Sequence, residues 1–103
     1  MNLNFLSSSE IVKLLGQRLK QERLLREWTQ AELARRAAVS LTTISNLEAG
    51  RNVSVETFVQ VAMVLGRTQE LSELFQPKVQ SLADMQRLEH AKTRQRIRVK
   101  KYD

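Results

Sequence analysis

The sequence predicts an all-α fold, and three observations support this prediction. Glycine and proline, the residues that most often interrupt helices, occur only three times and once among 103 residues. Apolar residues recur at helical spacing along most of the chain. Runs of β-branched residues, which favour strands, are short. With 42% apolar residues, the chain can bury the modest core of one five-helix bundle followed by a tail.

The first long helix is predicted to begin after Ser7, because Ser7 and Glu10 have the spacing of a capping box. Its apolar face consists of Ile11, Leu14, Leu15 and Leu19. Gly16 lies within this helix, where glycine costs about 1 kcal/mol relative to alanine. Either close packing of another helix or simple tolerance would explain it. Trp28, which follows this helix, is expected to fill the core rather than to stack on a ligand.

Residues 29–51 predict two short helices joined by a tight corner. Thr29 can cap the first helix, and Glu32 has the spacing that completes a capping box. Ser40 can cap the second helix, and Gly50 can end it in a left-handed conformation. The residues predicted to face the core are Leu33, Ala34, Ala37, Ile44 and Leu47. The second helix then leaves a strip of mostly small polar side chains exposed, which suits the major groove of DNA: Leu41, Thr42, Ser45 and Asn46.

Two further helices are predicted before Pro77. Ser54 can cap the fourth helix and Gly66 can end it. Its apolar stripe consists of Val55, Phe58, Ala62 and Leu65. The fifth helix is predicted over residues 68–76, ended by the proline. It presents three apolar residues that would either close the core or form a dimer seam: Leu71, Leu74 and Phe75.

The net charge of +6 lies almost entirely in the tail. Residues 1–76 contain nine Lys/Arg against eight Asp/Glu, whereas residues 77–103 contain eight against three. The apolar residues Leu82, Met85 and Leu88 predict one short amphipathic helix there. The end of the tail, residues 92–101, has six basic residues and no acidic one, so it is predicted to be disordered when alone. Its alternation of Arg96, Ile97, Arg98, Val99 and Lys100 resembles a strand, whereas Arg94, Arg98 and Lys101 would suit a helix.

Several classes of function are disfavoured. The chain contains no cysteine, and the lone His90 cannot build a metal site unaided, so no metal or cofactor is expected. No nucleophile–base pair, carboxylate cluster or phosphate-binding glycine loop is visible in the sequence, so an enzyme is not expected. The apolar runs are too short to span a membrane, and the first residues do not resemble a signal peptide. A cytoplasmic protein is expected.

The stretch TQAELARRAAVSLTTISNLEAGR, residues 29–51, resembles the helix-turn-helix of the phage-repressor (Xre/Cro) family. The matching elements are Thr29-Gln30, Leu33-Ala34, Val39-Ser40, Ile44-Ser45, Leu47-Glu48 and Gly50. The likeness extends from Leu15 to Gly66, roughly the middle half of the chain. The chain departs from the family at Ala38, because the family usually has glycine at the corner. If that position is left-handed, alanine there costs on the order of 1–2 kcal/mol.

The resemblance implies a DNA-binding domain over residues 7–76, with residues 77–103 as a basic tail that is partly disordered or binds a partner. It implies contacts to base edges by Leu41, Thr42, Ser45 and Asn46, and to backbone phosphates by Gln30, Thr43 and Arg51. It also implies a structural ion pair between Arg23 and Glu48.

Proteins of this family act as homodimeric transcriptional repressors on inverted-repeat operators in double-stranded DNA. The run from Val53 to Gly66 with its Arg-rich tail further resembles HipB-type antitoxins, which repress their own operon and partner a HipA-type kinase toxin. A stand-alone regulator without a toxin is the alternative. An interaction module that has lost DNA binding is a third possibility, against which the intact polar strip argues.

Overall fold

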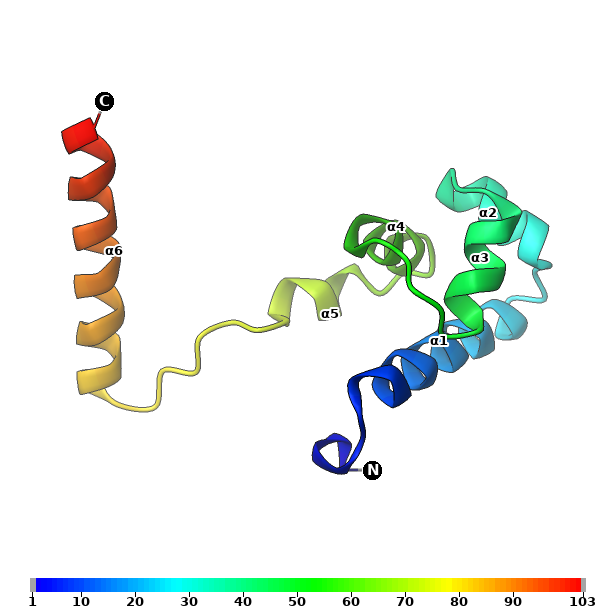
Figure 1. Ribbon diagram of the computed structural model, residues 1–103, viewed down its shortest axis with the longest axis horizontal. Helices are drawn as coiled ribbons and strands as arrows, with labels where there is room; N and C mark the ends of the chain where they lie inside the picture. Colours follow the sequence, from blue (N-terminus) through cyan, green and yellow to red (C-terminus); the bar gives the residue numbers. More distant parts are fainter. Residues whose placement is uncertain (1, 103) are drawn as a thin grey trace.

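The computed structural model describes the backbone of residues 2–102 and the side chains of residues 2–95. Every regular element in this range is helical, which confirms the all-α prediction. A 3-10 turn, η1 (Leu3–Phe5), precedes a helical body, and an extended linker leads from the body to a separate last helix (Figure 1). The body consists of α1 (Ser8–Leu25), α2 (Gln30–Ala37), α3 (Leu41–Glu48), α4 (Val55–Val64) and α5 (Thr68–Glu73), and the last helix is α6 (Leu82–Tyr102). None of the described helices is both long and apolar enough to cross a membrane.

Hydroxyl groups cap four of the helices at the predicted residues. At α1, Ser7 Oγ accepts from the Glu10 N–H at 3.2 Å and the Ser7 N–H donates to Glu10 Oε1 at 3.1 Å, so this capping box is complete. Ser40 and Ser54 cap α3 and α4 in the same way, with their hydroxyl oxygens accepting from a backbone N–H. These bonds satisfy donors that have no partner within the helix.

At α2 only half of the predicted capping box forms. Thr29 Oγ1 accepts from the Glu32 N–H at 3.0 Å. The Glu32 carboxylate, however, binds Arg35 and Arg36 on the next turn. Hydrogen bonding from Arg35, then from Arg36, lowers the pKa of Glu32 to about 2. The carboxylate therefore prefers two guanidinium groups to the single backbone N–H of a capping box.

The core lies where α2, α3 and α4 meet, with α1 packed against α3. Its most deeply buried side chains are Leu33, Ile44, Val61 and Leu65. Gly16 of α1 explains how closely α1 approaches α3, because a Cβ atom there would lie 2.3 Å from the carbonyl oxygen of Leu47. Close packing, rather than simple tolerance, accounts for this glycine. It seats the end of α3 directly on α1.

The corner between α2 and α3 is left-handed at Ala38, with φ 56° and ψ 42°. Replacing Ala38 by glycine relieves a strain of about 1–2 kcal/mol in the folded state. It also lowers stability by about 0.4–1 kcal/mol, because glycine gives the unfolded chain more conformational entropy. We therefore expect Ala38→Gly to raise the free energy of unfolding by about 0.5–1 kcal/mol, measured by urea denaturation. The matched control is Ala31→Gly in the exposed part of α2, which should lower it by a similar amount. A loss of stability in both variants would contradict the strain at Ala38.

Beyond Gly66 the structure differs from the predictions. α5 ends at Glu73 rather than near Pro77, because Leu74 is extended, with φ −65° and ψ 126°, and Phe75 then adopts a left-handed conformation with φ 57°. Leu74 and Phe75 are 55% and 91% exposed, so they do not close the core of their own chain. α6 runs for 21 residues, where only a short helix followed by a disordered or strand-like end was predicted. Its residues are mainly good helix formers, with neither glycine nor proline to end it.

Candidate nucleic-acid interface

α3 has one face fixed in the core and the opposite face open to solvent. Ser40 starts the helix, Ile44 and Leu47 are buried, and Gly50 ends it with φ 75°. The four residues predicted to contact bases are all away from the core: Leu41 and Thr42 are exposed, whereas Ser45 and Asn46 are half-buried. They form two adjacent pairs at i and i+4, which are neighbours on a helix surface. The structure thus brings these four residues together on one side of α3.

Leu41 is 53% exposed at the first position of α3. No acidic residue lies in the first turn of this helix, and Glu48 at its other end is buried. The open face of α3 is therefore neutral to weakly basic, and repulsion from an approaching phosphate backbone is absent at these positions.

Glu48 anchors the end of α3 to α1 through Arg23. Arg23 Nε donates to Glu48 Oε2 at 2.7 Å, and Arg23 Nη2 donates to Glu48 Oε1 at 3.0 Å. The two side chains are only 8% and 3% exposed, and Arg23 Nη1 also donates to the carbonyl of Trp28 at 2.7 Å. Side-chain hydrogen bonds to Glu48 raise the pKa of Arg23 above its ordinary value. The residues named for the structural ion pair are thus joined as a bidentate pair, the geometry in which arginine binds a carboxylate most strongly.

Gln30, named for a phosphate contact, also bonds to Glu48. It is the first residue of α2, and its Nε2 donates to Glu48 Oε1 at 3.0 Å. One of its two amide protons is therefore used within the protein, and the second proton is available to another acceptor. Through Glu48 the beginning of α2 is coupled to the end of α3. Sequence spacing did not indicate this bond.

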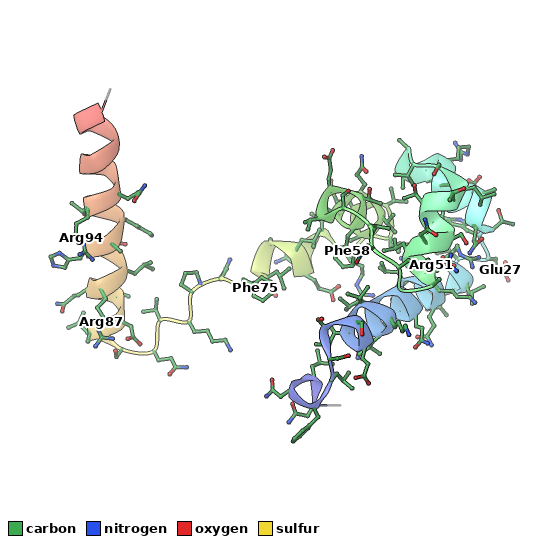
Figure 2. The ribbon with its side chains drawn as sticks, in the orientation of Figure 1. Glu27, Arg51, Phe58, Phe75, Arg87 and Arg94 are labelled. Atoms are coloured by element: carbon green, nitrogen blue, oxygen red, sulfur yellow. The ribbon has the colours of Figure 1, made fainter. Side chains whose placement is uncertain are left out.

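Arg51 and Thr43 are the other two residues named for phosphate contacts. Each forms a hydrogen bond next to the exposed face of α3. Arg51 Nη1 donates to Asn46 Oδ1 at 3.1 Å, and the Thr43 hydroxyl lies 2.7 Å from that of Ser40. Figure 2 shows Arg51 at the end of α3 that lies over α1. The bond from Arg51 occupies the oxygen of Asn46 and leaves its amide protons free.

Two arginine residues, Arg36 and Arg67, make contacts between the elements around this site that the sequence did not reveal. Arg36 stacks on Trp28, with its Cζ 4.2 Å from the ring centre, while the ring packs against the core. Trp28 therefore fills the edge of the core, as expected. Arg67 pairs with Glu22 of α1 and Glu70 of α5, and thereby links these helices. The spacing of Arg67 and Glu70 could have indicated one of these bonds, but the bond to Glu22 depends on the tertiary arrangement.

A candidate metal site would need several His, Asp or Glu side chains close together. Among the described residues, no group of three or more such side chains could hold a metal ion.

Comparison with known proteins agrees with this geometry. A model of the helix-turn-helix family matches residues 19–71, slightly more than half of the chain, and this range includes α2, α3 and α4. A search of curated proteins finds no significant match. The matched range contains every residue named above for DNA contacts and both members of the buried ion pair. The chain belongs to the helix-turn-helix family, of the phage-repressor type, whose members are sequence-specific DNA-binding regulators of transcription.

Proposed function

We propose that the protein is a transcriptional repressor that binds an inverted-repeat operator as a homodimer, with α3 in the major groove. The observation that carries this proposal is the open face of α3, where Leu41, Thr42, Ser45 and Asn46 lie together while Ile44, Leu47 and Glu48 are buried. A helix whose inner face is fixed can present its outer side chains to base edges without reorganisation.

Base reading rests on the chemistry of these four side chains. Asn46 can pair bidentately with adenine, and Leu41 or the Thr42 methyl group suits the methyl group of thymine. Bidentate pairing uses the oxygen of Asn46, one of whose two acceptor positions takes the bond from Arg51 in the free protein. We propose that Arg51 transfers this bond to a backbone phosphate on binding, so that the Asn46 amide can turn towards a base. Sequence reading and phosphate binding are then coupled at the end of α3.

Phosphate contacts set the position of α3 in the groove. Gln30 lies at the beginning of α2, where free backbone N–H groups favour an anion, and it keeps one amide proton for that contact. The Thr43 hydroxyl, beside the cap of α3, is the third donor. Such contacts determine the register of the protein on the duplex and carry no sequence information themselves.

A homodimer follows from the operator symmetry that such regulators use. Two copies of α3 would reach successive major grooves about 34 Å apart, so the operator is an inverted repeat. The division of the chain into a DNA-binding domain over residues 7–76 and a basic tail over residues 77–103 is part of the proposal. It is supported by the extended linker between α5 and α6 (Figure 1).

A narrower role as the antitoxin of a HipA-type kinase is proposed on the resemblance described above, with a stand-alone repressor as the alternative. The separate helix α6 supports it, because such a helix offers a surface for a protein partner away from the DNA-reading face (Figure 1). The neighbouring reading frame decides between the two: a kinase-like gene there favours the antitoxin, and its absence favours the stand-alone repressor.

The reading face is tested after an operator has been selected from randomised duplexes with the full chain. Replacing Thr42 by alanine is expected to cost about 1–3 kcal/mol on the operator and to relax preference at one base pair, because a base contact is lost. Replacing Asn46 by alanine should have the same effect; it also releases Arg51, which remains able to bind a phosphate. Replacing Gln30 or Arg51 by alanine is expected to weaken operator and scrambled duplex together, because phosphate contacts are common to both. Binding is measured on both duplexes at one salt concentration.

The matched control is Gln69→Ala on α5, an exposed polar residue outside the proposed interface, which should leave both affinities unchanged. Equal losses on the two duplexes for the Asn46 and Thr42 variants would show that α3 does not read sequence.

A further inference from the structure

We propose that Phe75 of one copy inserts into a groove between α1, α4 and α5 of a second copy, so that two identical contacts form a twofold dimer interface. This inference rests on the homodimer of the proposed function and names the surface that forms it. Three features of the described residues carry it: the conformation of Phe75, the shape of the groove, and the charges beside each.

Phe75 has a strained backbone conformation, and no contact within the described part of its own chain buries its side chain. Its side chain is 91% exposed, and its φ of 57° lies in the left-handed region, where a bulky residue is strained. Figure 2 shows it at the end of α5 remote from Phe58 and the rest of the body. Strain of this kind persists in proteins mainly where function uses it. A second molecule that covers the ring would supply the missing stabilisation, because aromatic burial dominates the energetics of interfaces.

The groove has the size and lining that an aromatic ring requires. It has a volume of about 280 Å³, and its lining includes the apolar residues Leu15, Leu19, Phe58, Ala62 and Leu71. Arg18, Glu22, Arg67 and Glu70 complete its lining. Glu22 and Glu70 both pair with Arg67, which orders that side of the groove and, among the described residues, leaves Arg18 as the lining residue whose positive charge is not used within the copy. Such a site, with an apolar centre and a polar rim, is typical of the pockets that receive interface anchor residues.

Charge at the two surfaces is complementary. Arg18 is exposed at the groove, and among the described residues it forms no ion pair. Glu73 lies two residues before Phe75 and is exposed; among the described residues, its carboxylate accepts only from the side-chain amide of Gln69, at 3.2 Å. Insertion of Phe75 would bring Glu73 of one copy towards Arg18 of the other. Opposite charges at the rim favour this partner and this orientation over others.

The position of the two features permits a closed dimer. Leu71 lines the groove of its own copy, and Phe75 lies four residues further along the chain, just beyond the end of α5. Each copy therefore supplies both an inserting residue and a receiving groove, and two such copies can pair about a twofold axis. None of the groove residues belongs to α3, so the reading face remains open in such a dimer.

Crosslinking tests the contact directly, because the natural chain has no cysteine. A tagged Gln76→Cys chain, which keeps Phe75, is mixed with an untagged Gln21→Cys chain, which keeps Arg18, and treated with a short bismaleimide. Gln21 lies next to Arg18 on the helix surface, so we expect a crosslinked heterodimer. The matched control is Glu56→Cys, on a different face of α4 from Phe58, which should give no heterodimer with Gln76→Cys. Equal crosslinking of both pairs, or of neither, would overturn the proposed contact.

Sedimentation equilibrium of the full chain measures the energetics. Phe75→Ala should raise the dimer Kd by at least about 30-fold, the effect of losing an interface hot spot. Arg18→Glu and Glu73→Arg should each raise the Kd, and the double variant should restore dimerisation. Thermal unfolding of the four variants should match that of the natural chain when all are monomeric, because these side chains lie outside the core. A double variant that fails to recover would overturn the charge pairing.

The outcomes separate this contact from the wider proposal. A natural chain that is monomeric even when bound to its operator would overturn both the homodimer and this contact. A natural dimer whose Kd is unchanged by Phe75→Ala would overturn this contact alone. A chain that carries both Gln76→Cys and Gln21→Cys and crosslinks only within single molecules would also overturn it, since Phe75 would then fill its own groove. Base preference should survive in Phe75→Ala, because α3 is not altered.

Discussion

Replacing either member of the Arg23–Glu48 pair is expected to lower the free energy of unfolding by about 3–5 kcal/mol. Arg23→Met leaves the Glu48 carboxylate buried without a positive partner, and Glu48→Gln leaves the Arg23 guanidinium buried without a negative one. A buried charge that loses its partner keeps its desolvation cost and loses its compensation. Because a small domain is stable by only about 5–15 kcal/mol, either change removes a large share of that stability.

The geometry explains why this pair should matter more than the other ion pairs. Arg23 donates three hydrogen bonds, two to Glu48 and one to the Trp28 carbonyl, and Glu48 also accepts from Gln30. Loss of Glu48 therefore leaves three N–H donors, two of Arg23 and one of Gln30, without their acceptor, and it releases the end of α3 from both α1 and α2. We expect DNA binding to fall with stability, since the orientation of α3 depends on the same bonds.

Urea denaturation with an unchanged m-value measures the loss. The matched control is Glu32→Gln, which breaks two exposed ion pairs within α2 and should change stability little. The double variant Arg23→Met/Glu48→Leu should recover most of the stability, because apolar residues of similar volume carry no desolvation cost. Single variants as stable as the natural protein would show that the pair does not fasten α3 to the bundle.

Local features of the fold could be predicted because neighbouring residues determine them. The hydroxyl caps at Ser7, Ser40 and Ser54 and the left-handed glycines at residues 50 and 66 formed where their spacing indicated. The exposed face of α3 followed from the burial of Ile44 and Leu47 at helical spacing. In each case the determining contacts lie within about one helical turn.

Contacts between elements could not be predicted in the same way. Even within α2 the prediction was incomplete where partners compete: Glu32 was expected to complete a capping box, but Arg35 and Arg36 of the same helix bind its carboxylate. The bonds from Gln30 to Glu48 and from Arg51 to Asn46 depend on how α2 and the loop after α3 approach α3. Sequence periodicity contains no information about such approaches. The exposed face of α3 was therefore predictable from the sequence, whereas the hydrogen bonds around it were not.

The tail was predicted least well, because the helix propensity of its residues outweighed the strand-like alternation of the sequence. Alternating basic and β-branched residues near Ile97 and Val99 resembled a strand, yet the backbone continues as a helix to Tyr102. Lysine, arginine and glutamine make up most of residues 92–101 and favour helix. Basic residues near the carboxyl end of a helix also interact favourably with its dipole. The helical backbone gives the tail a defined length along which its charges are spaced.

This basic helix is expected to dominate the salt dependence of DNA binding. Between residues 92 and 101 the chain carries six Lys/Arg and no acidic residue, whereas residues 1–76 sum to only +1, from nine basic and eight acidic residues. Each phosphate neutralised contributes about 0.9 to the slope of log affinity against log salt concentration. Neutralising all six charges should therefore flatten that slope by several units, up to about 5, and leave operator preference nearly intact.

The test replaces these six residues by glutamine, which removes the charge but keeps the helix propensity, and compares the result with deletion of residues 92–103. Both proteins should show the flatter slope while still distinguishing the operator from a scrambled duplex, since α3 is unaltered. Gln95→Ala, a change in the same helix without loss of charge, is the matched control and should leave the slope as it is. If the tail instead binds a protein partner, the slope will not change in any of the three variants. That result would show that α3 and the body attract DNA without help from α6.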